Sequence, residues 1–468
     1  MVRVPDHSRL WAAGAGVVSA AAGVAAGELA AAAVSPSVSP LTAAGGAVID
    51  ALPPGVKSWA VAAFGTSDKF AFIISMCLVM AVIAAAVGVA EFRRRLTGVA
   101  ILAVFGILGI AAVATRADAT TGAYAGPVVA AVVAGAVLAL LRRRFITWAA
   151  AAVAETGAGT AEDAGLMEDT GAVEDAGVIA DRTTTAPLSF AGTAPQGRRS
   201  FLRAFAVSAA VAAVAAVIAG AAHGTSAAIA SARAKLKLPT PSSPAPPIPT
   251  SARLNVPGIS DLVTANTDFY RIDTALVVPS VNPDSWKLTV TGMVDREVEL
   301  DLATLLGKPL IERYVTIACV SNEVGGNLIG NAKWLGWPVR ELLAEAGVKP
   351  GADMVFSSST DGFTASTPLA AMTDSRDAMI AVGMNGELLP LEHGFPARLI
   401  VPGLYGFVSA TKWLKNLNVT RFGDEVAYWS SRGWSDHGPI KLSSRIDTPR
   451  DGRSVTAGKV QFGGMAWA

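Results

Sequence analysis

The chain has 468 residues, of which 52% are hydrophobic and 16% charged, and its formal net charge at pH 7 is +1. It is too apolar for one ordinary soluble protein, and a net charge near zero argues against nucleic acid as the main partner. Only two cysteines are present, and one lies in an apolar segment, which excludes zinc or iron–sulfur sites built from clusters of cysteines.

Apolar runs in the first half of the chain predict a membrane region, with four helices in residues 1–149. The runs approach the roughly 20 residues that a helix needs to cross a bilayer, and the third is a little short. They are residues 10–34, 70–90, 99–114, 124–141 and, further on, 201–222. Ala and Gly dominate them, which suits close helix packing in lipid. Residues 45–64 are apolar but contain Pro53, Pro54 and Gly55, so we expect an interfacial or re-entrant piece there.

Arginine clusters predict the orientation of these spans. The clusters are Arg3 with Arg9, residues 93–95, residues 142–144, and Arg198 and Arg199 with Arg203. Short cytoplasmic loops carry an excess of Lys and Arg. Five spans with the N-terminus inside place all four clusters in the cytoplasm. The C-terminal half then lies outside a cytoplasmic membrane that the chain crosses several times.

The spans carry little polar chemistry. Glu28 is an exception, and an ionisable group in lipid is a functional candidate by default, although near a helix end it can simply reach the interface. No span contains histidine, the usual axial ligand of a membrane b-type haem, so we expect no haem there. The scarcity of charge also disfavours a transporter or channel. Anchoring in lipid or docking of a partner is the expected role.

Three segments connect the first four spans to the C-terminal half. Residues 150–197 are rich in Ala, Gly and acidic side chains, which predicts a disordered cytoplasmic loop. Residues 198–222 start with Arg-Arg-Ser-Phe-Leu-Arg before the fifth apolar run, a pattern that resembles the twin-arginine signal for export of folded proteins. The alternative is a plain positive pair flanking a helix. Residues 223–252 contain a proline-rich stretch that predicts an extended extracytoplasmic stalk.

Cys319 is the cysteine outside the apolar runs. Residues 314–318 before it predict a short buried strand, and the polar, Gly-rich stretch after it predicts a loop. A thiol at a strand end that faces a loop is placed to bind a ligand. The alternative is a small buried hydrophobe, which free cysteine usually is. A disulfide with Cys77 is excluded because Cys77 falls inside an apolar run.

Five blocks in residues 262–422 resemble, in order, the molybdenum-cofactor domain of the sulfite oxidase family. They are TDFYRID (267–273), WKLTVTG (286–292), the Cys319 block continuing to NAKWLGWPV (331–339), STDGFTASTPL (359–369), and residues 384–406 leading to KWL (412–414). The resemblance implies a mixed α+β molybdopterin-binding oxidoreductase domain at residues 253–422. A molybdenum cofactor is assembled in the cytoplasm, so export in folded form favours the twin-arginine interpretation.

The same resemblance implies the site residues. Cys319 would be the metal ligand and a catalytic residue, with Arg271 also catalytic. The cofactor would further be bound by Tyr270, Arg271, Ser358, His393, Arg398, Ser409, Thr411 and Lys412. Arg and Lys suit the cofactor's phosphate, and Gly403 and Gly406 would let the backbone approach it. The alternatives are surface charges for Arg271 and Arg398 and a core histidine for His393.

The substrate is where the resemblance weakens. Sulfite-oxidising members carry extra arginines just after the cysteine and a tyrosine before Asn-Gly, whereas this chain has residues 320–324 without arginine and Val382. We therefore expect a small-molecule oxo substrate, with reduction of a sulfoxide or N-oxide favoured over sulfite oxidation, and leave the electron-transfer partner open. An alternative of a different class is a cofactor-free membrane scaffold, which retention of Cys319 opposes.

Residues 423–468 resemble the first strands of the immunoglobulin-like dimerisation domain that follows in this family. Such a sandwich needs about seven strands and ~100 residues. We therefore expect a partial all-β domain here, and the resemblance allows a homodimer of the full-length protein.

Overall fold

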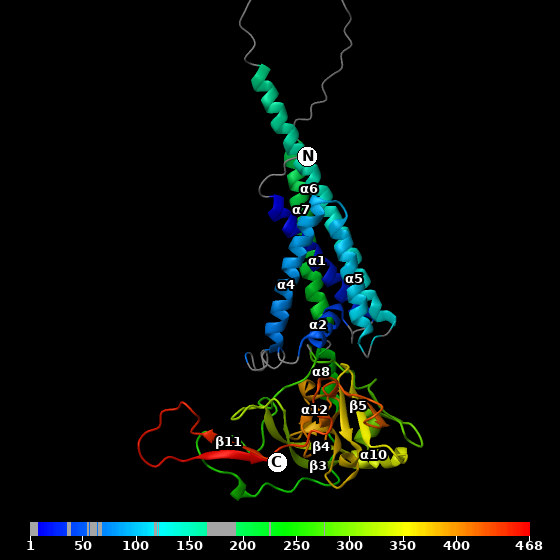
Figure 1. Cartoon of the computed structure of the whole chain (residues 1–468), viewed down its shortest axis with the longest axis vertical. Helices are drawn as coiled ribbons and strands as arrows, with labels where there is room; N and C mark the ends of the chain where they lie inside the picture. The colour runs from blue at the N-terminus through cyan, green and yellow to red at the C-terminus, as the bar shows by residue number, and fades with distance from the viewer. Residues whose placement is uncertain are drawn as a thin grey trace, which may run out of the picture.

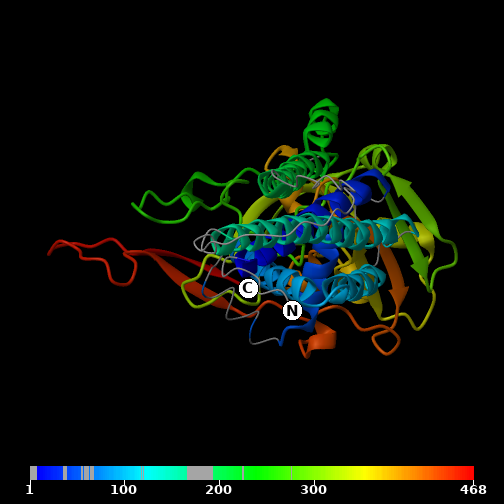
Figure 2. The same cartoon turned by 90° about the horizontal axis from the view of Figure 1, so that it is seen from above.

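The computed structural model describes the backbone of most of the chain: residues 8–34, 39–53, 56, 63, 68–116, 119, 121–165, 193–223, 226–275 and 277–468. It has two parts, a helical bundle and a β-rich domain formed by residues 236–468 (Figures 1 and 2). Helix α8 (Ser226–Lys235) lies between them.

Five long helices form the bundle and correspond to the five predicted spans. They are α1 (Ser8–Val34), α4 (Asp68–Arg93), α5 (Thr97–Ala114), α6 (Ala125–Gly165) and α7 (Thr193–His223). Within the described residues, five helices are long and apolar enough to cross a membrane. Large apolar side chains are exposed on their outer faces, such as Val82, 71% exposed, on α4 and Val217, 72% exposed, on α7. That pattern suits contact with lipid better than contact with water.

Small residues let α1 lie very close to its neighbours. A Cβ added at Gly16 would come within 2.0 Å of Ala84 O on α4, and one at Gly23 within 2.5 Å of Ala130 O on α6. Backbones that approach this closely gain dispersion contacts along the helix pair. The glycines of the apolar runs therefore serve helix packing, as predicted.

Three of the arginine clusters meet at one end of the bundle. Arg142 Nε donates to Glu91 O at 2.9 Å, and Arg144 Nη1 donates to Ser200 Oγ at 2.6 Å. These contacts join residues 93–95, 142–144 and 198–203 in space. The β-rich domain lies beyond the opposite end (Figure 1). This separation is what the predicted topology requires, and the direction of crossing stays a prediction.

Two buried glutamates cap helix ends in the bundle. Glu28 Oε1 accepts a hydrogen bond from Leu41 N, at 2.8 Å, in the first turn of α2 (Pro40–Ala51). Glu91 Oε2 accepts one from Gly98 N, at 2.9 Å, at the start of α5. A carboxylate at this position satisfies free N–H groups and interacts favourably with the helix dipole. Glu28 thus has a structural role, and a further function for it stays a prediction.

Two connecting segments differ from the expectation. The piece predicted at residues 45–64 begins as the end of α2, which packs on α5 through Ala43, Ala112 and Val113, and most of the rest lies outside the described residues. The loop predicted as disordered from residue 150 begins as a continuation of α6 to Gly165. Alanine has the highest helix propensity, which explains this extension. Residues 166–192 lie outside the described part of the chain.

The proline-rich segment follows the edge of the β-rich domain. Ser242 N donates to Leu310 O at 2.7 Å, and Ser243 forms a parallel bridge with Ile311 at the start of β3 (Ile311–Ala318). Proline tolerates such an edge position because it has no N–H to donate. At these residues the chain is extended, as predicted, but it pairs with the domain instead of standing free.

Two sheets with short helices form the β-rich domain, which confirms the mixed α and β fold predicted there. The first sheet has the order β2-β1-β10-β5-β6, and in the second β3-β4-β7-β8 pair in turn and β9 pairs with β7. The first comprises β1 (Lys287–Gly292), β2 (Val298–Asp301), β5 (Met354–Ser359), β6 (Thr364–Pro368) and β10 (Leu414–Thr420). The second comprises β3, β4 (Ile329–Pro338), β7 (Met379–Met384), β8 (Glu387–Leu388) and β9 (Arg398–Ile400).

Buried apolar side chains from both sheets form one core. Leu288 and Leu417 of the first sheet meet Leu335 and Ile380 of the second. Short helices cover this core: α9 (Leu302–Leu306), α10 (Val339–Ala346), α11 (Leu369–Thr373) and α12 (Gly406–Ser409). Short 3-10 helices lie elsewhere in the chain: η2 (Thr121–Tyr124), η3 (Thr250–Ala252), η4 (Leu391–His393) and η5 (Ser430–Arg432). The rigid core fixes the loops at the strand ends, where the candidate site lies.

The C-terminal residues form a hairpin of two antiparallel strands, β11 (Ser443–Thr448) and β12 (Gly463–Trp467), that extends from the domain (Figure 1). Buried Asp447 ties it down, since its carboxylate accepts from Ser260 N at 3.1 Å and from Arg445 Nε at 2.7 Å. An immunoglobulin-like domain at this position stays a prediction.

Candidate active site

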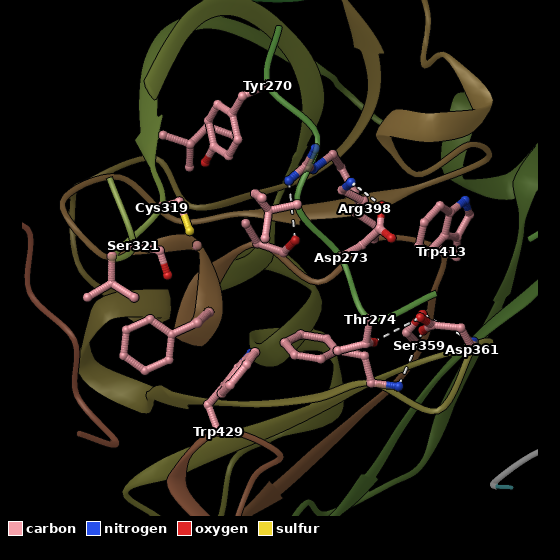
Figure 3. A pocket seen from close by; sticks show the side chains of 18 of the residues that line it. Tyr270, Asp273, Thr274, Cys319, Ser321, Ser359, Asp361, Arg398, Trp413 and Trp429 are labelled. Carbon is pink, nitrogen blue, oxygen red and sulfur yellow. Dashed lines mark hydrogen bonds and ion pairs between the residues drawn. The ribbon is translucent and has the colours of Figure 1, made fainter. Parts of the chain in front are cut away.

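Cys319 lies directly after β3, where the sequence predicts it. Its N–H donates to Leu328 O at 2.9 Å, and its carbonyl accepts from Asn322 N at 3.0 Å, so the loop folds back at this residue. The side chain lines a cavity with about 840 Å³ of empty space, which we call the Cys319 cavity (Figure 3). The thiol is therefore accessible to a ligand in the cavity and is not fully buried in the core.

The surroundings of Cys319 favour a metal as its partner. Burial raises the pKa of the thiol, and hydrogen bonds from Ser321 N–H and its hydroxyl lower it in part. A buried thiol of this kind ionises when a bound cation compensates its charge. Among the described residues no group of three or more His, Cys, Asp or Glu could hold a metal ion. A metal at Cys319 would therefore have to bring most of its ligands with it.

Aromatic side chains form one side of the Cys319 cavity. Phe363, Phe407, Trp429 and Trp434, here called the aromatic wall, all line it. Phe407 packs edge-on against Trp434 at 5.2 Å between ring centroids, and Trp434 lies 4.9 Å from Trp429. The wall makes this side of the cavity apolar, which favours neutral ligand groups there.

Phe269 anchors the segment that carries Tyr270 and Arg271. Its ring lies over Gly330 in β4, where an added Cβ would come within 2.5 Å of Phe269 Cε2, and it packs edge-on against Trp334 at 5.8 Å. Tyr270 lines both the Cys319 cavity and a second one beside it, whereas Arg271 lines the second. Glycine at position 330 is therefore needed for both residues to reach the site.

The second cavity, here called the His393 cavity, lies next to the first and shares Phe269 and Tyr270 with it. His393 Nε2 lies 3.1 Å from Asn266 O, which can only accept, so Nε2 carries the proton. Burial, with help from nearby Lys412 and Arg398, lowers the pKa of His393 to about 4. The imidazole is therefore neutral, and its Nδ1, which has no hydrogen-bond partner, is a free acceptor.

Three cations surround one carboxylate between the cavities. Asp273 Oδ2 accepts from Arg271 Nε at 2.9 Å and from Lys412 Nζ at 3.0 Å. Arg398 is held by backbone carbonyls, with Nη1 donating to His393 O at 3.1 Å. Burial lowers the pKa of Lys412 to about 8 and that of Arg398 to about 10, so both are largely charged at neutral pH. The trio with Asp273 carries a net charge of +2, which favours an anion.

Unsatisfied polar atoms mark where that anion would bind. Arg271 Nη2, His393 Nδ1 and Arg398 Nε are buried and have no hydrogen-bond partner. Leaving buried donors unpaired costs about 1–3 kcal/mol each, so such atoms call for a ligand. Two donors and one acceptor fit a polar, anionic, heteroaromatic molecule that spans both cavities.

The structure brings together six of the nine predicted site residues. Cys319, Tyr270, Arg398 and Lys412 line the Cys319 cavity, and Arg271 and His393 line the His393 cavity. Arg271 and Arg398 are not free surface charges, since one is bound to Asp273 and the other is 3% exposed.

Ser358, Ser409 and Thr411 do not line either cavity. Successive side chains of a strand face opposite ways, and the site-facing positions of β5 are Ser359, which lines the Cys319 cavity, and Ser357, whose Oγ lies 2.8 Å from Thr411 Oγ1. Ser409 Oγ donates to Tyr405 O at 2.9 Å. Thr411 and Ser409 therefore support the loop before Lys412, and a role of Ser358 in cofactor binding stays a prediction.

Sequence reasoning missed several residues of the site. Asp273 and Ser321 lie in blocks that the sequence singles out, but their roles depend on tertiary contacts. Trp429 and Trp434 lie beyond residue 422, the predicted end of the domain, so they were not expected in the site. Gly403 adopts a φ of 82°, which supports its predicted turn, whereas a Cβ at Gly406 would meet only ordinary contacts beyond 3.7 Å.

The structure shows where the residues that differ from sulfite-oxidising members lie. Glu323 is exposed and lines neither cavity, so it does not repel an anion at Cys319. Val382 is fully buried in the core between the sheets. The argument against an anionic substrate therefore rests on the aromatic wall and on the missing arginines.

Comparisons with known proteins agree with this geometry. A family profile described as oxidoreductase molybdopterin binding domain matches residues 275–429. Human mitochondrial sulfite oxidase is 30% identical over 247 residues, which cover 44% of this chain and 45% of that protein. The NADH nitrate reductase of Solanum lycopersicum is 33% identical over 178 residues, or 32% of this chain and 19% of that protein. This chain thus spans less than half the length of these relatives.

Among solved structures, the sulfane dehydrogenase SoxCD from Paracoccus pantotrophus is 25% identical, with a TM-score of 0.39, over 44% of this chain and 59% of that chain.

The molybdenum cofactor fits the residues present. A thiolate at Cys319 suits the metal, whose further sulfur ligands come with the cofactor, and the buried cations with their unpaired atoms suit the pterin and its phosphate. When bound, the cofactor supplies two-electron redox chemistry next to the aromatic wall. Taken together, the site and the matches show that residues 275–429 form an oxidoreductase molybdopterin binding domain that is similar to the one in sulfite oxidases.

Proposed function

We propose that the protein is a membrane-anchored molybdenum oxidoreductase that reduces a small, neutral sulfoxide or N-oxide. The observation that carries the proposal is the aromatic wall that lines the same cavity as Cys319 and makes that part of the cavity apolar. A dianion such as sulfite would need positive charge there that is free of other partners. The residues after Cys319 provide Ser321, whose hydroxyl is directed to the thiol.

The cations of the cavity are already engaged. Lys412 is bound to Asp273 and to Glu392 O at 3.0 Å, and Arg398 to two backbone carbonyls, which leaves its Nε. We assign these groups to cofactor binding. The substrate would then be oriented by Tyr270, whose pKa is raised by burial so that its hydroxyl keeps its proton and can donate to an oxo group.

The proposed reaction takes up two electrons and two protons. A dialkyl sulfoxide loses its oxygen and gives the dialkyl sulfide and water, and the electrons come from a donor of low potential. The aromatic wall would exclude water from this part of the cavity. The organic groups of the sulfoxide would pack against the wall, and its oxygen would then be directed to the metal site.

Sulfite oxidation is the second candidate. It is favoured by the names of the relatives, among them human sulfite oxidase, and by the presence of Arg398 and Lys412 in the Cys319 cavity. A cofactor-free scaffold is disfavoured, because a chain without the cofactor would keep buried polar atoms of Arg271, His393 and Arg398 without hydrogen-bond partners for no gain.

Steady-state kinetics on the purified full-length protein test the proposal. We expect dimethyl sulfoxide or trimethylamine N-oxide to oxidise a reduced viologen dye through the enzyme, and sulfite to reduce ferricyanide weakly or not at all. Fast turnover of sulfite without activity on sulfoxides or N-oxides would overturn the proposal in favour of the second candidate.

We further propose that the β-rich domain acts outside the cytoplasmic membrane and crosses it folded. Arg198 and Arg199 lie exposed at the start of α7, before the apolar part of that helix. Replacing both by Lys keeps the charge and removes only the arginine pair, so the domain should stay inside while the first four spans still insert. A C-terminal reporter that reaches the outside at the normal level would refute export through this motif.

A further inference from the structure

The segment that carries Trp429 and Trp434 of the aromatic wall also contacts the helical bundle. Tyr428 OH donates to Asp50 Oδ1 at 3.1 Å, and Arg432 Nη2 donates to the same oxygen at 3.2 Å. Asp50 belongs to α2, and Tyr428 immediately precedes Trp429 of the wall. A single bundle carboxylate therefore holds the segment that carries the two tryptophans.

Asp50 is itself held in place within the bundle. Arg116, just after α5, donates from Nη2 to Asp50 Oδ2 at 2.7 Å. Gly46 leaves room for that guanidinium, because a Cβ there would come within 2.5 Å of Arg116 Nη1. The side chains of Asp50, Arg116 and Arg432 are 33%, 22% and 19% exposed, so the cluster is partly shielded from water. Partial burial makes its charge-assisted hydrogen bonds stronger than those of an open surface pair.

The contact reaches the cavity through two packed rings. The Arg432 guanidinium lies 3.6 Å from the centroid of the Tyr428 ring, and that ring packs on Phe363 at 5.9 Å. On the other side, Trp429 packs edge-on against Tyr428 at 5.2 Å. Phe363 and Trp429 both belong to the wall, so a shift of Tyr428 would move the wall on two sides.

Local structure alone holds this segment weakly. It consists of the short turn η5 (Ser430–Arg432), closed by bonds such as Ser431 N to Ala427 O at 2.9 Å and Arg432 N to Trp429 O at 2.9 Å. Tyr428 N donates to Thr364 Oγ1 at 3.0 Å, which ties it to β6. A turn of this length needs tertiary contacts to stay ordered, and the Asp50 cluster is one of them.

We propose that Asp50 is a positioning residue for Trp429 and Trp434, and that the helical bundle thereby limits the size of substrate that the Cys319 cavity accepts. This rests on the proposed function of that cavity. The bundle would then be part of the enzyme's specificity as well as its anchor. Asp50 would act from outside the cavity, through Tyr428 and Arg432.

The test uses the full-length protein with its cofactor, in detergent or lipid discs. Hydrogen–deuterium exchange of residues 427–434 is compared in wild type, Asp50→Ala, Arg432→Gln and the double variant. We expect exchange there to rise about tenfold in Arg432→Gln, which loses one charge-assisted bond, and at least as much in Asp50→Ala, which also loses the bond from Tyr428; the double variant should exchange no faster than Asp50→Ala. Glu425→Gln, a change at an exposed carboxylate just before the segment, should leave exchange unchanged.

Kinetics supply a readout that a merely stabilising contact would not move. In Asp50→Ala we expect the KM for methyl phenyl sulfoxide to change about three- to tenfold, while kcat and the KM for dimethyl sulfoxide stay within about twofold. Unchanged exchange in residues 427–434, or parallel KM changes for both substrates, would overturn the inference. If the wild type reduces neither sulfoxide, the proposed function fails, and the exchange data still decide whether Asp50 positions the wall.

Discussion

Replacing Asp273 by Asn should strongly destabilise the β-rich domain when the cofactor is absent. Its carboxylate is 6% exposed and accepts from both Arg271 at 2.9 Å and Lys412 at 3.0 Å. Removing one partner of a buried ion pair typically costs about 3–5 kcal/mol, because the remaining charge is left uncompensated. Arg271, Arg398 and Lys412 would then face one another without a counter-charge.

Asp377 provides a matched control. It also binds two arginines, Arg313 at 2.8 Å and Arg340 at 2.9 Å, but its side chain is 24% exposed. Pairs nearer the surface contribute about 0.2–1 kcal/mol each. Asp377 has a φ of 55°, which Asn tolerates well, so Asp377→Asn removes the charge without backbone strain.

Thermal unfolding of protein made without molybdopterin measures the difference. For a domain of this size, about 1 kcal/mol corresponds to roughly 2–4 °C, so Asp273→Asn should lower Tm by roughly 6–20 °C and Asp377→Asn, with its two weaker pairs, by roughly 1–8 °C. Equal shifts for the two variants would refute the reasoning, because burial of the charge would then not decide the cost.

Two further predictions concern the His393 cavity and the segment beside it. The folded domain holds His393 neutral, with a pKa of about 4 against the ordinary 6.5, so the unfolded chain binds a proton that the folded one refuses. The free energy of unfolding of cofactor-free protein should therefore fall by about 2–3 kcal/mol as the pH falls from 6.5 towards 4. In urea titrations, His393→Gln should abolish this part of the pH dependence, and a pH dependence equal to that of the wild type would contradict the prediction. Gly330→Ala should displace Phe269, lower the free energy of unfolding by about 1–3 kcal/mol and lower the molybdenum content. A molybdenum content equal to that of the wild type would show that β4 moves instead of Phe269.

Much of the architecture follows from local pattern. The five apolar runs became five helices because length and composition decide whether a helix suits lipid. Cys319 lies at a strand end because an apolar run followed by Gly-rich sequence specifies that boundary. The resemblance to a known family then pointed to six side chains that the fold brings together.

The remaining features depend on contacts that no local pattern encodes. The sequence pointed to Ser358, whereas Ser359 lines the Cys319 cavity; which side of a strand a residue faces depends on register, and the pairing of β10 with β5 shifts between Leu414 and Asn416. Asp273 became the counter-ion of Lys412 across 139 positions of sequence. Trp429 and Trp434 reach the cavity from a segment that the sequence assigned to the following domain.

The measurement that tests the central claim most directly is molybdenum X-ray absorption, combined with metal analysis, on wild type, Cys319→Ser and Cys77→Ser. Cys77 is the matched control, a free and exposed thiol on α4. We predict about one molybdenum per chain in the wild type and in Cys77→Ser, with the same number of sulfur neighbours. In Cys319→Ser the metal should be lost, or its sulfur count should fall by one. The same sulfur count and metal content in all three proteins would contradict the assignment of Cys319 as the ligand.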